Sequence, residues 1–186
     1  MRTTSIVDDP SIGIMWSYGS NMSVEQMARR CPAAQKLAAL VCRGRLVFRG
    51  VADVTGARHE DLRVAGGLWA VTPACEAELD RYEGVERGTY LKRYFRLRVN
   101  GRDRWVLFYK MNARGVMPPT LSYLNTIIRG YHDFGLEDRL PLLESAVRDS
   151  WERARATPYL RYRHARTGNA VLARVDDVPQ KVKEVN

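Results

Sequence analysis

The pattern of apolar and polar residues near the start of the chain predicts a strand, a turn and a helix. Ile12–Ser17 is apolar enough for a buried strand, and Ser23 with Gln26 three residues later is typical of a helix start. The small and polar residues of Tyr18–Asn21 lie between them, where a glycine suits a tight turn or the close approach of a ligand. Unpaired N–H groups at such a turn favour an anion, although an ordinary turn uses the same residues.

The following stretch is expected to be mostly β-structure. The apolar and basic residues of Lys36–Val51 predict one bent strand or two short strands, with Gly44 at a bulge or bend. Ala52–Leu62 is predicted to be a polar loop. Val64–Val71 is a further strand, in which Gly66-Gly67 allows another segment to approach the backbone closely.

Residues 72–84 carry the start and stop signals of a helix. Thr72-Pro73 combines a cap residue with a proline at the first helical position, and Gly84 suits the end of the helix. Glu83 lies at that end, where the helix dipole is negative. A carboxylate is disfavoured there, so its pKa should rise, which suits a general acid/base near neutral pH. A surface glutamate that happens to end a helix would show the same local pattern.

The second half of the chain predicts a hairpin and two helices. Asn100-Gly101 between the β-rich runs Tyr90–Val99 and Arg104–Met111 is a strong hairpin signal. The apolar periodicity of Thr120–Phe134 and Leu136–Arg155 predicts two amphipathic helices.

The composition changes after residue 156. We therefore expect a folded domain over residues 1–156 and a basic C-terminal extension over residues 157–186. Within the extension, Leu160–Tyr162 and Ala170–Val175 are expected to pair as short strands around Thr167-Gly168-Asn169. The sequence leaves open whether the extension wraps the domain, pairs with a second chain in a homodimer or stays mobile.

Composition limits the class of protein. The chain has 186 residues, of which 45% are hydrophobic, as expected for one globular domain with an appendage. No apolar run approaches the roughly 20 residues that a membrane span needs, and residues 1–10 have no apolar signal region. We therefore expect a cytoplasmic protein without a membrane partner.

The net charge and the spacing of cysteines and histidines bear on nucleic-acid binding and on metal sites. The net charge of +9 permits nucleic-acid binding, but the arginines are spread along the chain and no nucleic-acid-binding motif is evident, so a generally basic surface is the expectation. The cysteines and histidines show no metal-ligand spacing, which favours free thiols and no metal site; they are Cys31, Cys42, Cys75, His59, His132 and His164.

Three motifs, in order, give the sequence a family resemblance. They are Trp16-Ser17-Tyr18-Gly19-Ser20-Asn21-Met22, then Gly67-Leu68-Trp69 with Leu79-Asp80-Arg81-Tyr82-Glu83-Gly84-Val85, and then Pro118-Pro119-Thr120-Leu121-Ser122-Tyr123-Leu124 with Ile127, Ile128 and Gly130. Together they resemble the γ-glutamylcyclotransferases of the AIG2-like superfamily, over roughly residues 12 to 155. Thr120 replaces the serine that is common in the third motif, which is a mild departure.

The resemblance implies a fold and a set of site residues. It implies an α+β fold: a small mixed β-barrel with flanking helices and a pocket at its mouth. Glu83 would be the catalytic acid/base. The substrate-binding residues would be Met15, Trp16, Ser17, Tyr18, Gly19, Ser20, Asn21 and Tyr123, with the Tyr18–Asn21 loop supplying backbone donors.

The implied activity is the cyclisation of a γ-glutamyl amine or γ-glutamyl amino acid to 5-oxoproline, with release of the free amine and without a cofactor. Three alternatives stay open from the sequence. The same chemistry would serve to remove a γ-glutamyl protecting group from a biosynthetic intermediate. A non-catalytic binding or scaffold protein could use the same fold, and the arginine-rich tail could bind nucleic acid.

Overall fold

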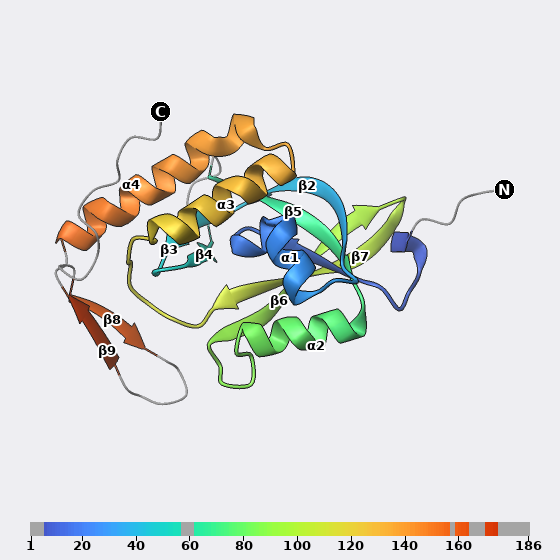
Figure 1. Cartoon of the computed structure of the whole chain (residues 1–186), viewed down its shortest axis with the longest axis horizontal. Helices are drawn as coiled ribbons and strands as arrows, with labels where there is room; N and C mark the ends of the chain where they lie inside the picture. The colour runs from blue at the N-terminus through green and yellow to red at the C-terminus, as the bar shows by residue number, and fades with distance from the viewer. Residues whose placement is uncertain (1–5, 57–61, 157–158, 164–169, 175–186) are drawn as a thin grey trace.

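A computed structural model describes residues 6–56, 62–156, 159–163 and 170–174 of the chain (Figure 1). Its centre is a five-stranded mixed sheet with the strand order β2-β5-β1-β7-β6. The central strand β1 (Gly13–Ser17) pairs antiparallel with β5 (Arg63–Val71) and parallel with β7 (Arg102–Met111). The outer strands are β2 (Gln35–Arg43) and β6 (Tyr90–Val99).

Two smaller strand pairs accompany the sheet. β3 (Arg45–Phe48) pairs with β4 (Ala52–Thr55), so the stretch around Gly44 forms two strands, and the predicted polar loop instead begins with a strand. β8 (Tyr159–Arg163) pairs antiparallel with β9 (Ala170–Arg174), as expected for the extension, while the proposed turn Thr167-Gly168-Asn169 lies outside the described residues. The division into a domain and an extension stays a prediction.

The helices flank the sheet, which confirms the α+β class. Figure 1 shows α3 (Leu121–Asp133) and α4 (Leu140–Ala156) next to each other on one side and α2 (Pro73–Tyr82) on the other, with the short α1 (Val24–Arg30) following β1. Short 3-10 turns occur at Ile6–Asp8, Ser20–Met22 and Glu137–Arg139. The expected barrel is not closed: in the part of the chain that the structure describes, the strands form an open sheet and separate pairs.

Local sequence signals explain most of these boundaries. Thr72 caps α2 by accepting a hydrogen bond from the N–H of Cys75, and Thr120 caps α3 in the same way from Tyr123. At the β6–β7 turn, Asn100 and Gly101 have φ of 49° and 77°, the left-handed geometry that the two-residue hairpin requires.

The glycine pair of β5 creates room for aromatic side chains. A Cβ added at Gly66 would lie 2.4 Å from Trp16 Nε1, and one at Gly67 would lie 2.3 Å from the Phe134 ring. Trp16 from β1 and Phe134 from the end of α3 therefore pack directly on this strand. The predicted close approach is confirmed, and it fixes the Trp16 side chain and the end of α3 against the sheet.

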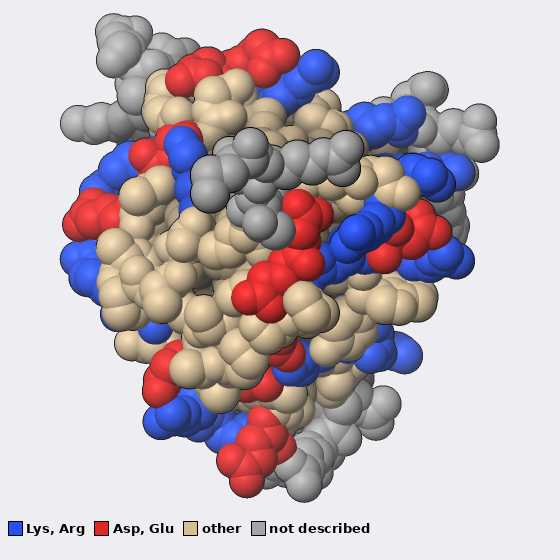
Figure 2. Space-filling view, turned by 90° about the vertical axis from the view of Figure 1, so that its right-hand side faces the viewer, with Lys and Arg blue, Asp and Glu red and all other residues tan. Residues whose placement is uncertain are grey.

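Figure 2 shows charged side chains of both signs distributed over the face that it presents, with uncharged areas between them. All three cysteines are free, and Cys31 and Cys75 are buried. No described helix has the length and apolar character to cross a membrane.

Candidate active site

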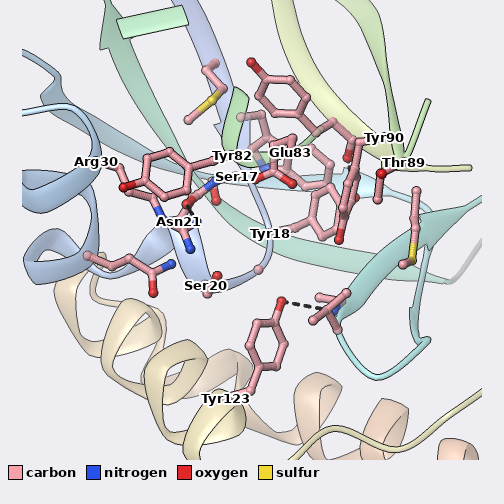
Figure 3. Close-up of a pocket in the computed structure, with 18 residues that line it drawn as sticks. Ser17, Tyr18, Ser20, Asn21, Arg30, Tyr82, Glu83, Thr89, Tyr90 and Tyr123 are labelled. Carbon is pink, nitrogen blue, oxygen red and sulfur yellow. Dashed lines mark hydrogen bonds between the residues drawn. The ribbon is translucent and has the colours of Figure 1, made fainter. Parts of the chain in front are cut away.

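A cavity of about 420 Å³ lies at the end of β1 (Figure 3). Its walls come from β1 and the turn after it, α1, the β3–β4 turn, the end of α2, the strands β6 and β7, and α3. All the residues predicted as site residues line this cavity: Met15, Trp16, Ser17, Tyr18, Gly19, Ser20, Asn21, Glu83 and Tyr123. Segments that are more than 100 residues apart in the sequence thus meet at one place.

The turn after β1 brings its polar groups to the cavity through local hydrogen bonds. The N–H of Met22 donates to Gly19 O at 3.0 Å, which makes a tight 3-10 turn, and Ser23 caps α1 by accepting from the N–H of Gln26. The predicted cap is therefore confirmed. A Cβ at Gly19 would lie 3.1 Å from Tyr123 Oη, so the glycine lets Tyr123 approach this turn.

Glu83 ends α2 and is held in place by its backbone. Its N–H donates to Leu79 O at 2.8 Å, and Gly84 follows with a φ of 62°, which ends the helix in the left-handed region. The Glu83 side chain lies in the centre of the cavity view in Figure 3. Its Oε1 accepts a hydrogen bond from Asn21 Nδ2 at 3.0 Å.

Burial raises the pKa of Glu83, while the hydrogen bond from Asn21 and the charge of Arg30 lower it in part. The direction agrees with the sequence-based expectation, but the principal cause differs. We expected the helix dipole to raise the pKa, whereas removal of the carboxylate from water is the largest contribution. Glu83 is the only carboxylate among the described residues that line the cavity.

Three tyrosines that line the cavity form hydrogen bonds with the structure around them. The Tyr18 hydroxyl donates to Tyr109 O, and the Tyr109 hydroxyl donates to Asp80 Oδ1 at 2.7 Å. Tyr123 Oη accepts from the N–H of Ala52 at 3.0 Å, the bond drawn in Figure 3. Burial raises the pKa of all three phenols above the ordinary value, so they remain protonated at neutral pH.

Sequence reasoning missed several residues of the cavity. Arg30 and Gln26 come from α1, and Tyr82 precedes Glu83, so proximity to the motifs could have indicated them. Arg30 donates from Nη1 to Asn21 Oδ1 at 2.5 Å, and its Cζ lies 4.9 Å from the centre of the Tyr82 ring. Val51 and Met111 reach the cavity only through the tertiary fold, and no local signal identifies them.

No metal-binding group is evident near this cavity. Among the residues that the structure describes, no three histidine, cysteine, aspartate or glutamate side chains gather in a way that could hold a metal ion.

Comparison with known families and structures agrees with the architecture. Residues 63–139 match the model of the AIG2-like family, a range that includes Glu83 and Tyr123 but not the turn after β1. The search of curated proteins gave no match.

Solved structures show the same fold. One is described as a gamma-glutamyl cyclotransferase; it has a TM-score of 0.62 and 21% identity, and the match covers 69% of this chain and 83% of that one. An uncharacterized protein from Homo sapiens has a TM-score of 0.61 and 22% identity over 68% of this chain and 82% of its own. YkqA from Bacillus subtilis has a TM-score of 0.61 and 19% identity over 78% of this chain and 57% of its own.

The family match and the structural neighbours confirm the resemblance to the AIG2-like, γ-glutamylcyclotransferase-like superfamily that the three motifs predicted. The chain has the fold of that superfamily. At these identities the neighbours establish the fold, and the roles of Glu83 and the other site residues stay predictions.

Proposed function

We propose that the cavity is the active site of a γ-glutamylcyclotransferase-type enzyme, which converts a γ-glutamyl amine or γ-glutamyl amino acid to 5-oxoproline and a free amine. The observation that carries this proposal is the environment of Glu83. It is a partly buried carboxylate with a raised pKa and an amide donor, in a cavity of a size that suits a small molecule. These are the properties of a group that takes up and returns a proton near neutral pH.

The reaction moves two protons, because the α-nitrogen is an ammonium in the substrate and carries a single hydrogen in the lactam product, while the leaving nitrogen gains both and is released as an ammonium. Glu83 takes a proton from the α-ammonium group of the γ-glutamyl moiety. The free amine attacks the γ-amide carbon, which forms the C–N bond of a five-membered ring and a tetrahedral oxyanion. Glu83 then protonates the leaving nitrogen as the original amide C–N bond breaks, which regenerates the carboxylate. The ring nitrogen loses its second proton, the released amine takes up one proton to become an ammonium, and no net proton is consumed.

The remaining walls support the same chemistry. The backbone of the Tyr18–Asn21 turn, together with Tyr123 from α3, forms a polar surface that suits a substrate carboxylate or the developing oxyanion. Because the nucleophile belongs to the substrate, a cavity that holds the curled conformer supplies much of the rate enhancement.

The first test is 5-oxoproline release from a panel of γ-glutamyl amino acids and amines. We expect release by the wild-type protein and a loss of about 1000-fold in kcat/KM for Glu83→Gln, within the range known for general acid–base groups. Glu78→Gln is the matched control, because Glu78 lies on the same helix but forms an exposed pair with Arg81.

Equal release by the wild type and Glu83→Gln would show that Glu83 is not the catalyst. No release from any member of the panel, with ligands that still raise the unfolding temperature, would identify a binding protein on this fold instead of an enzyme.

A further inference from the structure

Asn21 lies between Glu83 and Arg30, with one end of its side-chain amide turned to each. Its Nδ2 is 3.0 Å from Glu83 Oε1, and its Oδ1 is 2.5 Å from Arg30 Nη1. Figure 3 shows these side chains on the same wall of the cavity, beside Tyr82. The Asn21 residue is only 8% exposed, so water has little access to replace either partner.

The two ends of an asparagine amide have nearly the same shape but opposite hydrogen-bonding character. A guanidinium has donors and no acceptor, so Arg30 can form a hydrogen bond with Asn21 only when Oδ1 faces it. The N–H donors of Asn21 are then left for Glu83. Arg30 is itself held by the Tyr82 ring, whose centre lies 4.9 Å from its Cζ.

We propose that Arg30 is a positioning residue that fixes the orientation of the Asn21 amide, so that Asn21 presents donors rather than its carbonyl oxygen to Glu83. This inference rests on the proposed function of Glu83. A donor stabilises the carboxylate form, whereas a carbonyl oxygen would accept a hydrogen bond from the O–H of the neutral acid and stabilise that form. Arg30 thereby ensures that Glu83 meets the substrate as a base.

The other groups around Glu83 do not set the orientation of the Asn21 amide. Tyr18 from the turn after β1, Tyr109 from β7 and Tyr123 from α3 face it, but burial raises the pKa of each phenol above the ordinary value, so they stay neutral. Tyr90 from β6 also lines the cavity. Asp80 and Glu76 of α2 engage Lys92 and do not line the cavity. Among the described lining residues, Arg30 is the only cation.

The pH dependence of kcat/KM tests the proposal. In Arg30→Gln the Asn21 amide is free to turn over and a positive charge is lost, and both changes favour the protonated form of Glu83. We expect the acid limb of the profile to move to higher pH, with a loss of about 10-fold at about pH 6 that largely recovers at about pH 9. Arg30→Lys retains the charge and should give a smaller shift in the same direction.

Arg29→Gln is the matched control. Arg29 is the neighbouring residue, is 70% exposed and pairs with Glu25 on the surface, so removing its charge should leave the profile unchanged. A loss in Arg30→Gln that is equal at every pH would show that Arg30 is only structural, and an unchanged profile would show that it has no part in the reaction. Either result overturns the proposal.

A direct titration separates this inference from the proposed function. The carboxyl carbon of Glu83 is followed by ¹³C NMR in the wild type and in the Arg30 variants, with Glu83→Gln to assign the signal. Titration at higher pH in Arg30→Gln supports the positioning role even if the protein releases no 5-oxoproline. Identical titration curves overturn it, whatever the activity. If Arg30→Gln does not fold, Arg30→Lys serves for the same comparison.

Discussion

Two carboxylates of the same domain are buried in contrasting ways. Asp53 on β4 is fully buried; it accepts hydrogen bonds from Arg49 Nε at 2.8 Å and from the N–H of Met111 at 3.0 Å, with Lys110 Nζ 3.6 Å away. Glu83 accepts a hydrogen bond from a neutral amide, and Arg30, the cation whose charge lowers its pKa in part, bonds the far end of that amide.

The difference indicates what each carboxylate does. Two cations and a backbone donor compensate the charge of Asp53, which joins the β3–β4 pair to β7. These two elements supply Val51 and Met111 to the cavity. Glu83 is left in an environment that disfavours its charge and raises its pKa, and the proposed proton transfer rests on this difference. A buried carboxylate is therefore a catalytic candidate when its partners are too few, not simply because it is buried.

The largest loss of stability should follow from removing the charge of Asp53. Asp53→Asn leaves Arg49 and Lys110 without their carboxylate, and an uncompensated buried charge costs about 3 to 5 kcal/mol of unfolding free energy. Chemical denaturation measures the loss. Asp103→Asn, which removes an exposed pair with Arg96, should change the stability by less than about 1 kcal/mol. A loss of similar size in both variants would show that the Asp53 cluster is no more than a surface pair.

The same contrast explains how much could be predicted from the sequence. Glu83 was identified because its signals are local: a capped helix, a glycine after it and a motif with a fixed pattern. The predicted polar loop contains Asp53, because an aspartate whose charge is compensated only in the folded structure has the same local sequence pattern as one in water. Its partner Met111 comes from β7, 58 residues away, and only tertiary folding joins the two.

The fold shows the same limit. Periodicity and turn residues predicted β1, α1, α2 and the β6–β7 hairpin closely, because each boundary depends on residues a few positions apart. Whether the sheet closes depends on how its outer strands, β2 and β6, lie relative to each other. No single stretch of sequence contains that information, so the sequence predicted the α+β class and the strands but not that the sheet is open.

Glu83→Gln should increase the unfolding free energy, whereas Asp53→Asn decreases it, and the change should be smaller. Because the pKa of Glu83 is raised in the folded state, the folded protein binds more protons than the unfolded chain between the ordinary pKa and the folded pKa. The wild type therefore loses stability as the pH rises through that window, and the glutamine variant does not. At neutral pH and above we expect Glu83→Gln to gain about 0.5 to 2 kcal/mol, as is common when a functional group is replaced.

Thermal unfolding of both proteins across the acid and neutral range measures this gain. The difference between them should shrink as the pH falls below the folded pKa of Glu83. A variant that is less stable than the wild type at neutral pH would mean that the Glu83 carboxylate is compensated like Asp53, and the contrast between the two sites would fail.

The smallest effect on stability is expected for Lys110, the second cation beside Asp53. Lys110 is 35% exposed, its Nζ also donates to Val54 O at 2.8 Å, and Arg49 still compensates Asp53 when Lys110 is replaced. We expect Lys110→Met to cost about 0.5 to 1 kcal/mol, because partly exposed pairs are screened by water. A double-mutant cycle with Asp53→Asn measures the coupling between the two side chains. Coupling as large as the whole effect of Asp53→Asn would show that Lys110, not Arg49, is the main counter-charge, and that the distance of 3.6 Å understates its contribution.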